Sequence, residues 1–250
     1  MELQNAFTIC LVMFMLLGFV LMYFVGIKSP YGKLANSKFG PLISARLAWV
    51  VMESPAFAIP FYFTISNWDR FMALPISNKI CMNLFMIHYF NRALIYPFLI
   101  NNPRPVPLSV PFFAMCFCIL NGVSQGLQLL RYPTTDVDSP QFLLGLVLFA
   151  MGMYLNIDSD RILRNLRPPG SSEYKIPRGG MFEYVSQANF FGEIVEWTGF
   201  ALMCGNIVAA MFVVNTCLNV VPRALQTHQW YVQKFDNYPQ SRKAVFPYVL

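Results

Sequence analysis

Charge is scarce in this sequence. Only 12% of its 250 residues are Asp, Glu, Lys or Arg and 56% are hydrophobic, whereas a typical soluble domain has about 25% charged and about 45–50% apolar residues. This composition disfavours a water-soluble globule and makes lipid the expected solvent. Glycine and proline are scattered without period among many aromatic residues, which excludes collagen-like and disordered chains.

Metal-binding and nucleotide-binding signatures are also missing. There are only two histidines and no C-x-x-C pair, so neither a zinc site nor a disulfide framework is indicated. No G-x-G-x-x-G follows a strand and no G-x-x-x-x-G-K occurs, which excludes Rossmann and P-loop nucleotide sites. The six cysteines lie in apolar stretches and are interpreted as small buried residues: Cys10, Cys81, Cys116, Cys118, Cys204 and Cys217.

Long apolar runs dominate what is present. Residues 6–27 run 22 positions without a charge, with no basic region before them and no cleavage-site pattern after them, so they predict a retained membrane helix rather than a signal peptide. We therefore predict a single domain, residues 1–250, that is an all-α integral membrane protein with a bundle of seven transmembrane helices. The six further spans are predicted at about 47–65, 80–100, 109–130, 141–157, 185–204 and 206–225.

The basic residues predict the orientation of the bundle. Of the 18 Lys and Arg residues, all but four follow the first, third, fifth or seventh span; Arg70, Lys79 and Arg131 lie on the other face, and Arg92 lies within the third span. Cytoplasmic segments of membrane proteins carry an excess of Lys and Arg, so the N-terminus is expected outside and the C-terminus in the cytoplasm. The net charge of +6 then reflects topology and needs no nucleic-acid partner. The host membrane is expected to be the endoplasmic reticulum in a eukaryote or the inner membrane in a bacterium.

Several polar residues lie inside the predicted spans, where a charged side chain costs at least about 2.5–3.5 kcal/mol. They repeat at helical spacing, so that five helices carry a polar stripe. Most stripes lie in the predicted cytoplasmic half, which favours one polar cavity that opens to the cytoplasm and has an apolar rear. The stripes are Trp49 and Glu53; His88, Tyr89 and Arg92; Asn156, Asp160 and Arg164; Asn189, Glu193, Glu196 and Trp197; and Arg223, Thr227 and Tyr231.

Each stripe alone also has a structural interpretation. Asn156 and Asp160 could mark a solvated helix end, and the nearby arginines could be positive-inside anchors. A lone histidine such as His88 is more often a satisfied core residue than a ligand, and aromatic residues are often packing. Glu53 is harder to dismiss, because it lies about 10 Å along its helix from Arg46. The coincidence of stripes on five helices favours a functional site.

The chemistry of the stripes suggests the kind of ligand. A mouth rich in Arg and Lys above an aromatic interior fits a phosphate-bearing cofactor that meets a hydrophobic substrate, and the polar segment 167–180 (RPPGSSEYKIPRGG) suits an anion. A lipid or ion transporter would also use intramembrane charges. Transporters, however, tend to show internal repeats or broken helices, and neither is visible in this sequence.

Distinctive blocks run along nearly the whole chain. They are KSPYGK at 28–33, WVVMESPAF at 49–57, HYFNRALIYP at 88–97, NPRP at 102–105, NGVSQG at 121–126, NIDSDRILRNLRPPG at 156–170, EYKIPRGGMFEYVSQANFFGEIVEW at 173–197 and QWYVQKFDNYPQSRKAVFPYVL at 229–250. Together they resemble the steroid 5α-reductases, also called 3-oxo-5α-steroid 4-dehydrogenases, which are seven-helix membrane enzymes.

The resemblance implies an NADPH-dependent reduction of the C4=C5 double bond of a 3-oxo-Δ4-steroid, with hydride transfer to C5. It implies that Glu53 and Tyr89 hold the C3 carbonyl, with Trp49 also on the substrate side. Steroid and membrane lipid are the expected partners; no metal and no obligate protein partner are expected. The implied NADPH contacts are Asn156, Asp160, Arg167, Tyr174, Asn189, Glu193, Arg223 and Tyr231, with Tyr31, Arg92 and Arg104 as additions.

Two positions depart from the family pattern. Thr227 stands where the steroid reductases carry a histidine, which leaves substrate preference open. Lys175 stands where an arginine is common, and a lysine cannot make the same bidentate phosphate contact. Another lipid reductase of the wider superfamily, acting on a polyprenol or an enoyl thioester, is the nearer alternative, and a transporter is the more distant one. The pairing of Glu53 with Tyr89 favours the steroid.

Overall fold

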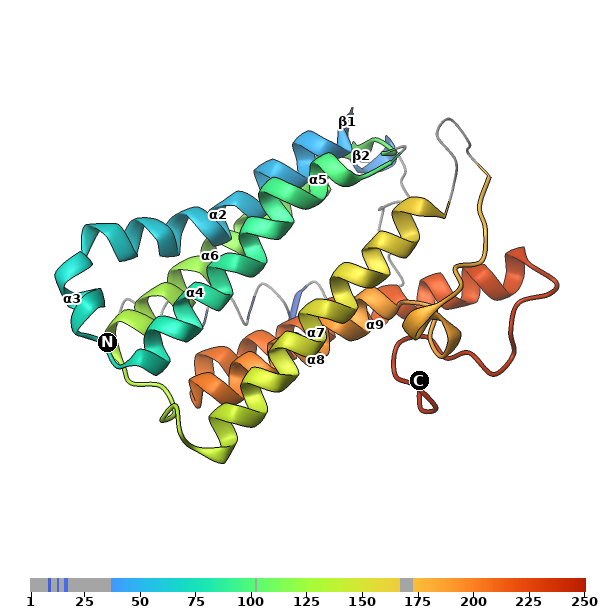
Figure 1. The fold of residues 1–250 in the computed structure, drawn as a ribbon. Helices are drawn as coiled ribbons and strands as arrows, with labels where there is room; N and C mark the ends of the chain where they lie inside the picture. Colours follow the sequence, from blue (N-terminus) through green and yellow to red (C-terminus); the bar gives the residue numbers. More distant parts are fainter. Residues whose placement is uncertain (1–8, 10–12, 14–15, 18–36, 102, 167–172) are drawn as a thin grey trace.

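The computed structural model describes residues 9, 13, 16–17, 37–101, 103–166 and 173–250. The first predicted span, 6–27, therefore falls almost wholly outside the described residues. Helices occupy the other six predicted spans (Figure 1): α2 (Ala45–Ser66), α4 (Ile76–Phe90) continued by η3 (Asn91–Ile95) and α5 (Tyr96–Leu99), α6 (Ser109–Arg131), α7 (Pro140–Asn165), α8 (Ala188–Cys204) and α9 (Ile207–Lys234). Four of these helices, α2, α6, α7 and α9, are long and apolar enough to cross a membrane.

Shorter elements join the long helices. A 3-10 turn, η2 (Ser37–Phe39), leads into strand β1 (Leu42–Ile43), which pairs antiparallel with β2 (Val106–Pro107). The sequence predicts an all-α protein, and this small sheet is a departure from that prediction, although each strand is only two residues long. A short helix, α3 (Trp68–Ala73), follows α2, and a second 3-10 turn, η4 (Gly180–Glu183), precedes α8.

Four predicted boundaries differ from the helix ends by three residues or more, one of them the start of α4 at Ile76 rather than about residue 80. The helices α7 and α9 continue past residues 157 and 225, because hydropathy detects only the apolar part of a helix, whereas polar residues such as Asp160 and Arg164 extend it without breaking it. The start of α8 is at Ala188 rather than residue 185. The backbone before it is extended instead, since Ser186 and Gln187 donate to the carbonyl groups of Lys243 and Ala244 at 2.8 and 3.1 Å.

The turn between α8 and α9 is set by two adjacent residues. Gly205 ends α8 in the left-handed conformation, with φ of 60°, which glycine adopts without a steric penalty. The side-chain oxygen of Asn206 then accepts a hydrogen bond from the backbone N–H of Ala209 at 3.0 Å and so caps α9. This tight turn makes α8 and α9 an antiparallel hairpin.

The connections after alternate helices gather at the same end of the molecule. Arg46 donates to the carbonyl of Ile100 at 3.4 Å, and Asn101 at the end of α5 donates to the carbonyl of Arg164 at the end of α7 at 3.1 Å. At the opposite end, Thr135 N donates to the carbonyl of Met203 at 3.2 Å. The segments predicted to share the basic face therefore lie together, as alternating crossings require.

The helices form two groups, α2 with α4 and α6, and α7 with α8 and α9 (Figure 1). Aromatic side chains fill the space where the groups meet. The fully buried Phe85 on α4 lies with its ring centre 5.7 Å from that of Phe200 on α8 and 6.3 Å from that of Phe212 on α9. Trp197 on α8 joins the same cluster, 5.9 Å from Phe85.

Within the second group, α7 and α8 touch backbone to backbone. A Cβ on Gly192 of α8 would lie 2.6 Å from the backbone nitrogen of Asn156 on α7, and a Cβ on Gly152 of α7 would collide with the backbone of Glu196. Small residues allow such close packing of membrane helices, where apolar surface alone gives little driving force. The contact fixes the register between Asn156 on α7 and Glu193 and Glu196 on α8.

The glycine contact generates a stability prediction. Gly152→Ala should lower the free energy of unfolding by about 1–3 kcal/mol, because the methyl group forces the two backbones apart. At about 2–4 °C per kcal/mol for a chain of this size, the melting temperature in detergent should fall by several degrees. Ala150→Leu adds more volume at an exposed position of the same helix and is the matched control. Equal melting temperatures for the two variants would contradict the role of this contact.

Candidate active site

Arg92 lies at the centre of a buried polar network. Its guanidinium donates to Asp160 Oδ2 on α7 at 2.7 Å and lies 3.5 Å from Glu193 Oε1 on α8. The same group lies 4.6 Å from the ring centres of Trp49 on α2 and Tyr96 on α5, within the range of a cation–π contact. One cation thus joins two carboxylates and two aromatic rings from four helices.

The backbone that carries Arg92 is unusual. Residues Asn91–Ile95 form a π-helical turn, and Pro97 follows just after it. Proline has no N–H, so Pro97 cannot donate to the carbonyl of Ala93, and its ring would crowd that carbonyl in a regular α-helix. The widened turn accommodates this conflict. Such turns are frequent at functional sites, and here the turn places the Arg92 side chain between α7 and α8.

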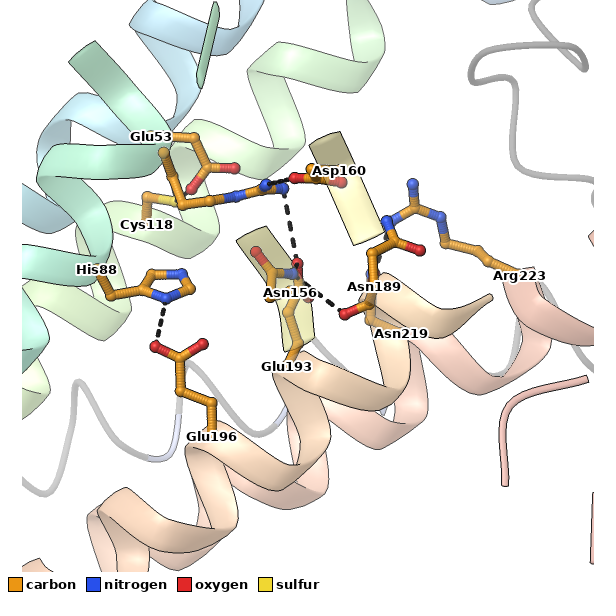
Figure 2. Close-up of polar contacts among 11 residues, drawn as sticks. Glu53, His88, Cys118, Asn156, Asp160, Asn189, Glu193, Glu196, Asn219 and Arg223 are labelled. Carbon is orange, nitrogen blue, oxygen red and sulfur yellow. Dashed lines mark hydrogen bonds and ion pairs between the residues drawn. The ribbon is translucent and has the colours of Figure 1, made fainter. Parts of the chain in front are cut away.

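An amide side chain extends the network toward the start of α8. Asn156 Nδ2 donates to the backbone carbonyl of Asn189 at 3.1 Å and to Glu193 Oε1 at 3.3 Å. The side-chain oxygen of Asn189 is buried and has no hydrogen-bond partner in the described part of the chain. Figure 2 shows Asn156, Asn189 and Glu193 gathered below Asp160. The unpartnered oxygen leaves this corner with an acceptor available for a ligand donor.

Glu53 and Tyr89 are held by neighbouring residues of α6. The Cys118 thiol donates to Glu53 Oε2 at 3.7 Å, and Asn121 Nδ2 donates to the Tyr89 hydroxyl at 3.2 Å. Cys118 and Asn121 are three residues apart and therefore on one face of α6. The buried Tyr89 ring is also stacked near Trp197, at 5.9 Å between centres and 25° between planes.

A second buried pair lies beside Tyr89. His88 Nδ1 and Glu196 Oε1 are 2.7 Å apart, and the His88 ring centre is 4.4 Å from that of Trp197. Figure 2 shows this pair below Glu53 and Cys118. The sequence places both residues on polar stripes but gives no sign that they meet, because they are 108 residues apart.

The remaining predicted cofactor residues lie nearer the ends of α7 and α9. The Arg104 guanidinium is 4.7 Å from the Tyr174 ring centre, and that ring is 4.8 Å from Trp230 on α9. Arg223 donates to Asn219 at 3.1 Å and lies 5.1 Å from the ring of Phe190.

Tyr231 on α9 is stacked on Tyr238, at 5.4 Å between ring centres. Tyr31 and Arg167 lie outside the described residues.

The structure thus brings together most of the predicted site residues: Trp49, Arg92, Asn156, Asp160, Asn189 and Glu193 form one bonded network, with Glu53 and Tyr89 beside it. Asn121, Cys118, Tyr96 and the His88–Glu196 pairing are additions that sequence reasoning missed. A hint for Asn121 existed in the block NGVSQG, whose polar residues interrupt an apolar span. Around Arg92 the polar groups contact each other directly, and the single cavity open to the cytoplasm stays a prediction.

The donor set fits a phosphate-bearing cofactor better than a metal. No group of three His, Cys, Asp or Glu side chains in the described ranges could hold a metal ion. Guanidinium groups from Arg104 and Arg223 suit phosphate oxygens, and the unpartnered Asn189 oxygen suits a hydroxyl or amide donor. Taken together, the fold and the site define a helical membrane protein with a charged interior site enclosed by aromatic residues.

Comparison with known proteins identifies the family. The family model described as 3-oxo-5-alpha-steroid 4-dehydrogenase matches residues 104–250. The chain is 44% identical over 223 residues to 3-oxo-5-alpha-steroid 4-dehydrogenase 1 of Macaca fascicularis, which covers 88% of this chain and 84% of that protein. It is 38% identical over 259 residues to steroid 5-alpha-reductase DET2 of Gossypium hirsutum, covering 98% of each. The chain belongs to the 3-oxo-5-alpha-steroid 4-dehydrogenase family, whose members are oxidoreductases.

The buried Arg92 pair generates a prediction. Arg92→Met should lower the free energy of unfolding by about 3–5 kcal/mol, because it leaves the buried Asp160 carboxylate without its cation. The double variant Arg92→Met, Asp160→Asn should recover part of that loss. Thermal melting of the four proteins in the cycle measures the coupling.

A matched control exists on the surface of α7. Arg161 contacts Asp158 at the same 2.7 Å, but the Arg161 side chain is 56% exposed. Arg161→Met should therefore change stability by no more than about 1 kcal/mol. An Arg92→Met variant as stable as Arg161→Met would show that the interior network contributes little.

Proposed function

We propose that this protein is an NADPH-dependent reductase of the C4=C5 double bond of 3-oxo-Δ4-steroids. The names of its relatives assign a 3-oxo-5-alpha-steroid 4-dehydrogenase or a steroid 5-alpha-reductase activity to those proteins. The observation that carries the proposal is the joint support of Glu53 and Tyr89 by Cys118 and Asn121 on one face of α6. This support presents a carboxyl group and a phenol together beside the Arg92 network.

The proposed chemistry uses this pair at the C3 carbonyl. Bound NADPH supplies the hydride that adds to C5. Negative charge then develops on the C3 oxygen, and the Tyr89 hydroxyl donates to that oxygen while it accepts from Asn121, so that the two bonds polarise each other. Loss of one such donor typically costs about 10²–10³ in rate. A protonated Glu53 would give a second donor, and an ionised Glu53 would orient Tyr89.

The Arg92 network has a different task in the proposal. Arg92 holds Asp160 and Glu193 in place, since each carboxylate has the guanidinium as a partner. Asn156 ties Glu193 to the Asn189 backbone. The network would thereby fix amide and carboxylate groups for the polar end of the cofactor. Trp49 and the aromatic cluster around Trp197 would exclude water from the reacting carbons.

The finer topology belongs to the proposal as well. We place the N-terminus outside and the cofactor side of the site toward the cytoplasm. The excess of Lys and Arg in the segments that follow α5, α7 and α9 supports this orientation. The hydrogen bond from Asn101 to the carbonyl of Arg164 supports placing the first two of these segments on one face.

The activity test uses the purified chain with NADPH and a panel of enones. Wild-type protein should convert a 3-oxo-Δ4-steroid such as testosterone or progesterone to its 5α product, identified by mass spectrometry against standards. Tyr89→Phe should lose about 10²–10³ of kcat, because the donor to the C3 oxygen is gone, and Glu53→Gln should also lose most of kcat. Both should keep the thermal shift that NADPH produces. Turnover at the wild-type rate in both variants would contradict the assignment of Glu53 and Tyr89 to the C3 carbonyl. Reduction of only non-steroid enones would contradict the steroid as substrate.

The cofactor assignment has its own test. Asn189→Ala should raise the KM for NADPH more than the KM for steroid, because its side-chain oxygen is assigned to the cofactor. Asn83→Ala is the control, since Asn83 lies exposed on α4 and donates only to Lys79 of its own helix at 2.8 Å. A larger change in the steroid KM than in the NADPH KM would overturn the assignment of this corner of α8.

A further inference from the structure

The His88–Glu196 pair has no task in the mechanism above. His88 is 5% exposed and Glu196 is fully buried, and their contact joins α4 to α8. The second carboxylate oxygen of Glu196, Oε2, is buried and has no hydrogen-bond partner among the residues the structure describes. A pair that served only to hold two helices together would leave an expensive unsatisfied acceptor. The arrangement therefore points to a role beyond packing.

The position of His88 suggests that role. It directly precedes Tyr89 and is four residues before Arg92, so that it shares a helix face with Arg92. Its ring centre is 5.1 Å from that of Tyr89. Glu196 takes Nδ1, and Figure 2 shows the other ring nitrogen turned away from Glu196. Nε2 is thus the ring nitrogen that the Glu196 contact leaves available.

We propose that His88, oriented by Glu196, is the proton donor to C4 of the substrate. The proposal rests on the function proposed above, in which hydride addition at C5 leaves an enolate whose electron pair is shared by C4 and the C3 oxygen. That pair forms the new C4–H bond with the proton of Nε2. The electrons of the broken N–H bond remain on Nε2, the proton on Nδ1 stays with the Glu196 contact, and solvent restores the Nε2 proton.

The other titratable groups around the site have different roles and are not assigned as the proton donor to C4. Tyr89 and Glu53 serve the C3 oxygen, and a proton given up by Tyr89 would remove the donor that stabilises the enolate. Cys118 donates to Glu53. Asp160 and Glu193 are both paired with Arg92. Imidazole changes charge near neutral pH, and a carboxylate on Nδ1 both fixes its tautomer and stabilises its cation, as in hydrolase triads.

Isotope effects on single-turnover NADPH oxidation and on product formation test the proposal. His88→Gln should lower the rate of product formation by about 10²–10⁴, the usual contribution of a positioned acid. Protonation would then be the slow step, so the solvent isotope effect in D₂O should rise and the isotope effect of 4-deuterated NADPH should shrink. Glu196→Gln should shift both effects in the same direction by less, and the double variant should lose no more than His88→Gln alone.

Controls separate chemistry from folding. Thr216→Val removes a buried hydroxyl that donates only to Phe212 of its own helix at 2.9 Å and should keep wild-type rates. The NADPH thermal shift reports whether each variant folds. If His88→Gln fails to fold, the isotope effects of Glu196→Gln, which keeps its volume, decide the question.

Three outcomes are distinct. Unchanged isotope effects in a folded His88→Gln or Glu196→Gln protein, whether the rate falls or not, would overturn the proton-donor role. Larger solvent effects and smaller hydride effects would support it. A wild-type protein that does not reduce any 3-oxo-Δ4-steroid would instead refute the proposed function, and with it the reaction that His88 is assigned to complete.

Discussion

The backbone contact between α7 and α8 is the constraint on which the interior site depends. At Gly152 and Gly192 the two helices are so close that a Cβ on either glycine would collide with the backbone of the other helix. Only at this separation can the short Asn156 side chain reach both the Asn189 carbonyl and Glu193. The same register brings Asp160 and Glu193 within reach of one guanidinium. The polar network is thus built on helix packing and would lose its geometry if the helices separated.

The second requirement is neutralisation of buried charge. Lone charges inside a membrane protein are expensive, and here two buried pairs join different helices: Arg92 from η3 with Asp160 of α7, and His88 of α4 with Glu196 of α8. These contacts cross between the two helix groups, which the aromatic cluster around Phe85 and Trp197 also joins. Electrostatic pairing and aromatic packing therefore act on the same interface, and together they bring Glu53 and Tyr89 to one side of the network.

Much of this arrangement can be predicted from the sequence, for definite reasons. Apolar runs mark the helices, and polar residues at a spacing of three or four positions mark the faces that meet, so Asn156, Asp160, Asn189 and Glu193 could be assigned to one site. Pairings between distant helices could not, because spacing along the chain carries no information about which stripe opposes which. The bond from Asn121 to Tyr89 and the bond between His88 and Glu196 are of this kind. The polar ends of α7 and α9 could not be predicted from hydropathy either, because a helix can continue through charged residues after its apolar part has ended.

The π-helical turn at Asn91–Ile95 also divides one predicted span into two rods. An extra residue in a turn rotates everything beyond it by about 100° relative to a straight α-helix. The rod before the turn is therefore registered against α8 through His88, while the rod after it is registered against α2, where Tyr96 meets Trp49 edge to face with their ring centres 4.9 Å apart. Arg92 sits at the joint, so its direction is set by the length of the turn as much as by the identity of its neighbours. A single-residue deletion there would rotate the helix after the turn relative to the helix before it. The contacts to α2 and to α8 could then not form together, although every side chain of the network would still be present.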